Sequence, residues 1–360
     1  MRIAKNVVFL QKSEYFFHGR LDFSFRVWYN KSYGAAPKAK NATVGGNTVK
    51  ERSIITLTLN PAFDLHCSVH NFELRSECFA EMISVDAGGK GINVSRALKV
   101  NGTDSLAIVV VGAENAMEFC KALNRDNLRY EEIWAEGRIR QNLTLHEEGN
   151  NYETRISFDG FACDASILRK VKHRVEVTEN CIVTFTGSAP KGVSVEEIKE
   201  LLKEFQSAGA KIVIDSRSFS YEDLIEMKPW LIKPNRVEAT KYLGKPVQTV
   251  ETAVEMATKF HENGVENAVV SLGGGGAVLV CDEGTYRAYA PRSGVVSTIG
   301  AGDSLLAGFI HGDTKGFSIE DTLRLAVACG SAACLTEGTR PPEKAKIDEL
   351  FAQIQVEKLS

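Results

Sequence analysis

The residues best suited to chemistry in this sequence are a carboxylate and the glycine-rich turn before it. Asp303 lies in STIGAGDSLLAGF, residues 297–309, directly after Gly300, Ala301 and Gly302. A Gly-Ala-Gly turn at a helix start gathers backbone N–H groups at the positive end of the helix dipole, which suits a transferring phosphoryl group. A carboxylate there can accept the proton of an attacking hydroxyl. The segment predicts a phosphoryl-transfer centre, although a plain capped helix start would use the same residues.

A second glycine-rich turn, DAGGKGINVSRAL, spans residues 86–98. Gly88 and Gly89 allow the backbone to approach a small polar ligand closely, and Lys90 supplies a positive charge. Asn93 lies at the start of the helix that follows. A glycine-rich turn with a solvated lysine is the structural alternative.

A third segment, KPNRVEATKYL, places Asn235 and Glu238 three residues apart at a helix start. Both side chains would lie on one face of the helix, where they could hold Mg²⁺ through water. A capping box between the same two residues explains this spacing equally well.

The run SLGGGGAVLV, which begins at Ser271, predicts a loop thin enough to lie against a nucleotide. A tight hairpin would need the same glycines. The sequence has neither a Walker A pattern nor G-x-G-x-x-G, which argues against P-loop and standard dinucleotide-binding proteins.

The elements that must position these residues form an alternating α/β pattern. Apolar runs such as IITLTL (54–59), CIVTFTG (181–187) and KIVID (211–215) predict buried strands, with amphipathic helices such as VEEIKELLKEF (195–205) between them. This pattern predicts a mostly parallel sheet with helices on both faces. Two regions, about 64–88 and 138–160, instead suggest short strands forming a small lid over the carboxyl edge of the main sheet.

Composition limits the classes of partner. The 360-residue chain is 44% hydrophobic with a formal net charge of −3, so neither nucleic acid nor an anionic membrane is an expected partner. We found no membrane span or signal peptide, and the eight scattered cysteines suit a reducing compartment, so we expect a cytoplasmic protein. Residues 1–52 are rich in Lys and Arg and are expected to be a disordered extension before a domain at 53–352.

Taken together and in order, these segments resemble the PfkB branch of the ribokinase-like carbohydrate kinases. The resemblance covers roughly residues 54–350. It rests on TLNPAFDL, AGGKGINVSRAL, GRIRQN, TGSAPKG, IKPNRVE, SLGGGGA and STIGAGDS. It implies a three-layer α/β/α fold with a β lid that often clasps a homodimer, and it implies ATP and Mg²⁺.

The resemblance also implies roles for single residues. The sugar would be bound by Asp64, Gly88, Gly89, Lys90 and Asn93, and the phosphate already on the substrate by Arg140, with Asn142 beside it. ATP would be contacted by Lys233, Asn235, Ser271, Gly273 and Gly276, and Mg²⁺ organised by Asn235 and Glu238, through water. Gly300, Ala301 and Gly302 would form the anion hole, and Asp303 would be the base.

Within the branch the motifs are most similar to those of 1-phosphofructokinases, which implies conversion of fructose 1-phosphate to fructose 1,6-bisphosphate. Tagatose-6-phosphate kinases are the close alternative. A non-catalytic sugar-phosphate sensor is a rival from another class, although a mere binder has no need of a base. An oxidoreductase is disfavoured because the dinucleotide fingerprint is missing.

Three positions depart from the pattern that the resemblance leads us to expect. The stretch from Ser76 to Ala80 differs from the usual segment, and DSRSFS at Asp215 lacks a Ser-Gly. Thr144 stands where we expect a lysine, two residues after Asn142, which removes one phosphate contact. These changes bear on the identity of the sugar more than on phosphoryl transfer.

Overall fold

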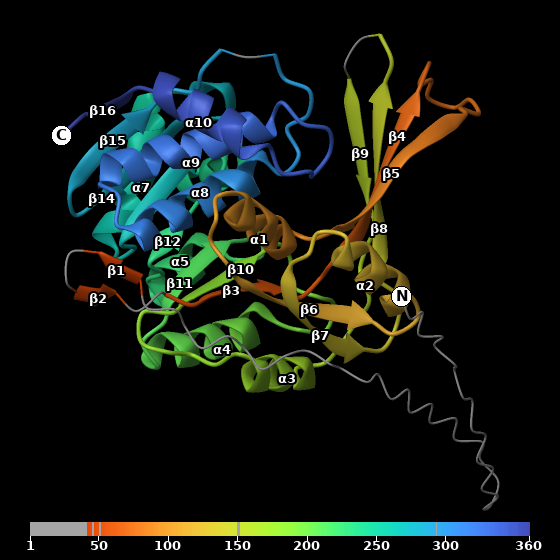
Figure 1. The fold of residues 1–360 in the computed structure, drawn as a ribbon, viewed down its shortest axis with the longest axis horizontal. Helices are drawn as coiled ribbons and strands as arrows, with labels where there is room; N and C mark the ends of the chain where they lie inside the picture. The colour runs from red at the N-terminus through yellow and green to blue at the C-terminus, as the bar shows by residue number, and fades with distance from the viewer. Residues whose placement is uncertain (1–41, 45–46, 50–51, 150–151, 293) are drawn as a thin grey trace, which may run out of the picture. The chain divides into compact units, whose positions relative to one another are not determined.

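The computed structural model describes residues 42–44, 47–49, 52–149, 152–292 and 294–360 (Figure 1). Most of the predicted N-terminal extension lies outside these residues. Its described part is a hairpin of β1 (Ala42–Val44) and β2 (Asn47–Val49), which belongs to a separate unit, Met1–Lys50. Sequence analysis did not predict this hairpin, because three-residue strands carry too little alternation to stand out. The domain limits stay a prediction.

The second unit, Glu51–Ser360, is built on a ten-stranded sheet. Its parallel part runs, in spatial order, through β7 (Arg129–Ala135), β6 (Leu106–Gly112), β3 (Ile54–Thr58), β10 (Ile182–Thr186), β11 (Lys211–Asp215), β12 (Leu231–Ile232) and β13 (Asn267–Ser271). The antiparallel strands β14 (Ala277–Cys281), β15 (Gly284–Ala288) and β16 (Val356–Lys358) complete it. The predicted, mostly parallel sheet is confirmed.

Helices cover both faces of this sheet, as expected for strands that are buried throughout. Ile54 and Ile55 of β3 point to opposite faces and join different hydrophobic clusters. One cluster includes α1 (Lys90–Val100), α8 (Ala301–Lys315), α9 (Ile319–Ala333) and α10 (Lys344–Gln353). The other includes α2 (Ala116–Asn124), α3 (Ser166–Arg174), α4 (Val195–Ser207), α5 (Tyr221–Met227), α6 (Arg236–Leu243) and α7 (Val250–Glu262). The three-layer architecture is therefore confirmed.

A separate four-stranded sheet projects beyond these layers, at the upper right of Figure 1. Its order is β5 (Ala80–Gly88), β4 (Ala62–Val69), β8 (Arg140–Glu147) and β9 (Glu153–Ser157), and only β4 and β8 are parallel. Both predicted lid regions contain these strands, which confirms the small second sheet; we call it the lid.

No helix in the described part of the chain combines the length and apolar character needed to cross a bilayer.

Candidate active site

The candidate residues gather where parallel strands end and two helices begin. Asp215 is the last residue of β11, Lys233 follows β12, and Ser271 ends β13. Lys90 is the first residue of α1, and Asp303 lies in the first turn of α8. The carboxyl ends of parallel strands meet at one edge of a sheet, which is where ligands of such folds bind.

Asp303 is buried at the centre of this group. Its Oδ2 accepts a hydrogen bond of 2.9 Å from Asn93 Nδ2, joining residues that are 210 positions apart. Burial raises the pKa of Asp303 to about 6; the charges of Lys90 and Lys233 and the Asn93 hydrogen bond oppose this, while Asp215 adds to it. A carboxylate with such a pKa is mostly ionised at neutral pH yet basic enough to take a proton. The structure thus brings the two glycine-rich turns together.

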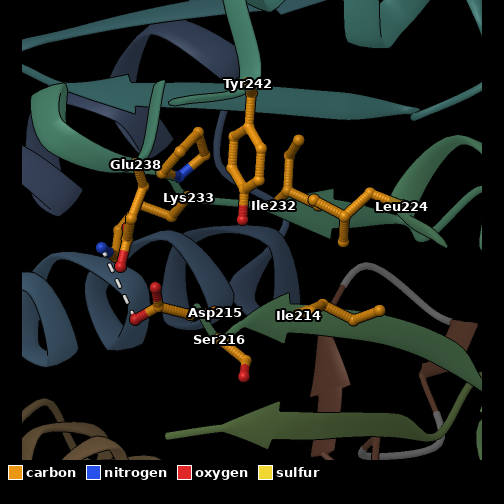
Figure 2. Close-up of a pocket in the computed structure, with 9 residues that line it drawn as sticks. Ile214, Asp215, Ser216, Leu224, Ile232, Lys233, Glu238 and Tyr242 are labelled. Carbon is orange, nitrogen blue, oxygen red and sulfur yellow. Dashed lines mark ion pairs between the residues drawn. The ribbon is translucent and has the colours of Figure 1, made fainter. Parts of the chain in front are cut away.

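Two lysines share one buried carboxylate beside Asp303. Asp215 Oδ2 lies 3.2 Å from Lys90 Nζ and 3.5 Å from Lys233 Nζ. Figure 2 marks the Lys233 ion pair and shows Glu238 pointing toward it. Burial opposes the charge on Lys90, but Asp215, Asp303 and Glu238 outweigh burial and raise its pKa. Burial likewise opposes the charge on Asp215, and the two lysines overcome it, so the pKa of Asp215 is lowered.

Asp215 was not among the predicted site residues. The available signal was a charged residue at the end of the apolar run KIVID, since such an end faces the ligand edge of a parallel sheet.

Asn235 and Glu238 form the capping box that the sequence left open as an alternative. Asn235 Oδ1 accepts from the backbone N–H groups of Val237 (2.9 Å) and Glu238 (3.0 Å), and Glu238 Oε2 accepts from the Asn235 N–H at 3.0 Å. The Asn235 oxygen is therefore engaged. Glu238 also lines a pocket with Asp215, Lys233 and Tyr242 (Figure 2).

The residues at this pocket can be tested for a fit to Mg²⁺. The described residues hold no cluster of three or more His, Cys, Asp or Glu that could bind a metal by themselves. Mg²⁺ at a phosphate site needs only one or two carboxylates, because waters and phosphate oxygens complete its shell. Glu238 meets this requirement as a carboxylate at the edge of the pocket, whereas Asn235 does not offer a free oxygen.

The glycine loop after β13 is a short 3₁₀ turn, Gly273–Gly275, beside the start of α6. Ser271 forms an isolated β-bridge with Asn235. Gly276 has φ +86°, and a Cβ there would lie 1.9 Å from the carbonyl oxygen of Ala288, so only glycine fits. A Cβ on Gly302 would lie 3.1 Å from Lys233 Nζ, which places the Gly300–Gly302 turn next to that lysine.

The lid supplies the remaining predicted residues. Asp64 Oδ1 accepts from Asn142 Nδ2 at 2.8 Å and from Arg155 Nη2 at 2.7 Å. A Cβ on Gly88 would lie 2.1 Å from Asp64 Oδ2, so this carboxylate lies directly against the turn before Lys90. The polar face of the lid therefore borders the site.

Arg140 starts β8 and donates to three backbone carbonyls, those of Phe158 (3.1 Å), Asn60 (3.3 Å) and Pro61 (3.4 Å). Burial lowers the pKa of Arg140; Asp64 opposes this, and the neighbouring cations Arg155 and Arg217 add to it. Arg155 and Arg217 thus both lie close enough to Arg140 to affect its charge, which the separate sequence segments did not reveal.

Arg96 is another residue that sequence analysis missed. It is buried on α1 and donates to Asn93 Oδ1 at 3.0 Å, to the Ala87 carbonyl at 2.6 Å and to Asp126 Oδ2 at 2.5 Å. Its contact fixes the Asn93 amide so that the NH₂ group faces Asp303. An arginine three residues after Asn93, on the same helix face, was the available signal.

The chain is similar to known carbohydrate kinases in sequence and in fold. A sequence profile described as "pfkB family carbohydrate kinase" matches residues 63–346. The chain is 31% identical to the 1-phosphofructokinase of Haemophilus influenzae over 307 residues, 84% of this chain and 98% of that protein.

Two solved structures of phosphofructokinase-2 from Escherichia coli resemble the fold, each covering 84% of this chain and 99% of theirs. The complex with substrates and products gives a TM-score of 0.78 at 28% identity. The tetrameric inhibited form gives 0.77 at 27%.

Proposed function

This chain belongs to the pfkB family of carbohydrate kinases, and from that premise we propose that it phosphorylates fructose 1-phosphate with ATP to give fructose 1,6-bisphosphate and ADP. The observation that carries the proposal is the buried Asp303, whose pKa of about 6 suits a general base, beside the Gly300–Gly302 turn and Lys90. The similarity to a 1-phosphofructokinase along almost its whole length supports the choice of sugar.

In the proposed reaction Asp303 accepts the proton of the free primary hydroxyl of the sugar. The hydroxyl oxygen forms a bond to the γ-phosphorus while the bond from that phosphorus to the ADP oxygen breaks. Backbone N–H groups of Gly300, Ala301 and Gly302 would hold the charge on the transferring group, since they lie at the start of α8. Lys90 and Lys233, which both pair with Asp215, would add positive charge.

On the lid side, Asp64 and Asn142 would bind sugar hydroxyls together with Asn93, and Arg140 would contact the existing phosphate. The loop with Ser271, Gly273 and Gly276 would lie along ATP. Glu238, with Asn235 holding its helix end in place, would bind Mg²⁺ through water. When bound, the ion would neutralise phosphate charge.

The proposal is tested by measuring ADP release with fructose 1-phosphate, fructose 6-phosphate and tagatose 6-phosphate. We expect the largest kcat/KM for fructose 1-phosphate. A higher value for tagatose 6-phosphate would reassign the sugar and leave the kinase in place. Release of no ADP with any sugar phosphate would refute the enzymatic role and favour a sensor.

We also infer that the chain forms a homodimer through the lid. Met82 and Val85 lie on one face of the lid, and both side chains are substantially exposed. Phe79, in the loop before β5, is 84% exposed. Clustered exposed apolar residues mark contact surfaces in soluble proteins. Light scattering should report a dimer that Phe79→Ser weakens, whereas Met117→Ser, at an equally exposed site on α2, should not. A monomeric wild-type protein would rule this out.

A further inference from the structure

Arg155 lies opposite the position where the sequence lacks an expected lysine. The β8–β9 register pairs Thr144 with Arg155. Directly opposed residues of antiparallel strands point to the same face of a sheet. Accordingly, Arg155 Nη1 lies 3.5 Å from Thr144 Oγ1, and Arg155 Nη2 lies 2.7 Å from Asp64 Oδ1. The arginine thus occupies the space over Thr144 that a lysine at 144 would have entered.

We propose that Arg155 binds the phosphate group that the sugar already carries, replacing the lysine absent at position 144, and that it makes the enzyme prefer a phosphorylated sugar. The proposal rests on the proposed function, because it assumes that Asp64 and Arg140 border the sugar-phosphate site. It assigns the preference to Arg155 on β9 instead of a lysine at position 144 on β8.

Arg140 alone has too few free donors for a phosphate group, so a second cation can contribute. A guanidinium has five N–H donors, and Arg140 directs three contacts to backbone carbonyls. A phosphate monoester carries about −1.5 to −2 charges at neutral pH on three oxygens. One partly engaged arginine cannot satisfy such a group, so a second charged donor at the same wall of the site is expected.

Arg155 keeps donors available for this role. Its side chain is 30% exposed, while the side chain of its partner Asp64 is only 3% exposed. The contacts with Asp64 and Thr144 involve Nη2 and Nη1 and hold the guanidinium in place. An arginine fixed at one edge and open to solvent at the other is preorganised for an oxyanion.

The alternative is that Arg155 only holds Asp64 for the sugar hydroxyls. The two roles differ in what the loss of Arg155 would affect. A phosphate contact matters for fructose 1-phosphate and not for fructose, whereas a misplaced Asp64 weakens binding of both.

The experiment measures binding of fructose 1-phosphate by calorimetry and the inhibition constant of fructose, with KM values where turnover occurs. For Arg155→Gln we expect affinity for fructose 1-phosphate to fall about 10- to 100-fold, as for loss of a charge-assisted hydrogen bond. The fructose constant and the KM for ATP should stay within about threefold. Arg169→Gln, an exposed arginine of α3, is the matched control and should change nothing.

The exchange variant Thr144→Lys with Arg155→Thr restores a cation on the other strand and should recover most of the lost affinity. Unchanged affinity in Arg155→Gln, an equal loss for fructose, or no recovery in a folded exchange variant would each overturn the proposal. Failure of the proposed function would look different: the wild-type protein itself would bind fructose 1-phosphate without releasing ADP.

Discussion

Replacing Asp303 by Asn should slow catalysis severely and stabilise the fold. The carboxyl group is fully buried and its pKa is raised to about 6 from 3.8. A difference of about 2 pH units between the folded and unfolded states corresponds to roughly 3 kcal/mol of unfolding free energy at pH 7. Asparagine removes this cost and keeps an oxygen that can accept from Asn93 Nδ2. The kcat should fall about 10²- to 10⁴-fold, because a positioned base is lost.

The stability gain of Asp303→Asn should depend on pH, and its sign follows from the raised pKa of Asp303. The folded state binds the proton more tightly than the unfolded state, so ionisation of Asp303 costs stability as pH rises from about 4 to about 6. Below that window the wild-type carboxyl group is protonated in both states. The stability gain of Asp303→Asn should therefore be largest at pH 7 and small near pH 4.

Denaturant unfolding of both proteins, followed by circular dichroism between pH 4 and pH 8, measures this difference. Activity assays on the same preparations give kcat. The prediction is wrong if the variant is less stable than wild type at pH 7, or if the difference in unfolding free energy does not change with pH. Either result would show that burial does not control the pKa of Asp303. Unchanged turnover would remove Asp303 from the role of base.

Two further predictions concern the pH profile and the glycine loop after β13. The kcat/KM should rise with pH around a midpoint near 6. Asn93→Ala should move this midpoint upward, because the Asp303 carboxylate loses a hydrogen bond. A midpoint identical in both proteins would point to ionisation of the substrate instead. Gly276→Ala should destabilise the fold by several kcal/mol, on the order of a severe core clash, whereas Gly274→Ala, whose Cβ meets nothing within 4 Å, should not. Thermal unfolding of the two glycine variants decides the second point.

The parts of the fold that the sequence predicted are those determined by local pattern. β3 and β11 were identified because their residues are apolar on both faces, as a covered parallel sheet requires. The GAGD turn was identified because a glycine-rich turn at the start of a helix is typical of anion-binding sites. For Asn235 and Glu238 the sequence allowed two interpretations, because a capping box and a metal site need the same spacing. The structure shows the capping box.

Features that depend on pairing between distant segments could not be predicted. The Asn93–Asp303 hydrogen bond joins residues 210 positions apart, and Asp215 gains its two lysines only when the ends of β11 and β12 and the start of α1 meet. The position of Arg155 depends on the β8–β9 register, and a shift of one residue would point it to the other face of the lid. β9 is too polar and too exposed for its sequence to fix that register.

In the proposed mechanism, the arrangement of charge around Asp303 would let one site hold phosphates and still contain a base. Lys90 and Lys233 would attract phosphate, but alone they would also keep Asp303 ionised and weaken it as a proton acceptor. Asp215 counters this by pairing with both lysines and by adding a negative charge that raises the pKa of Asp303. Burial then acts on a nearly balanced set of charges, and Asp303 keeps a pKa close to neutral pH. Asp215, which sequence analysis did not include in the site, is thus the residue that would allow Lys90 and Lys233 to bind phosphate while Asp303 stays basic.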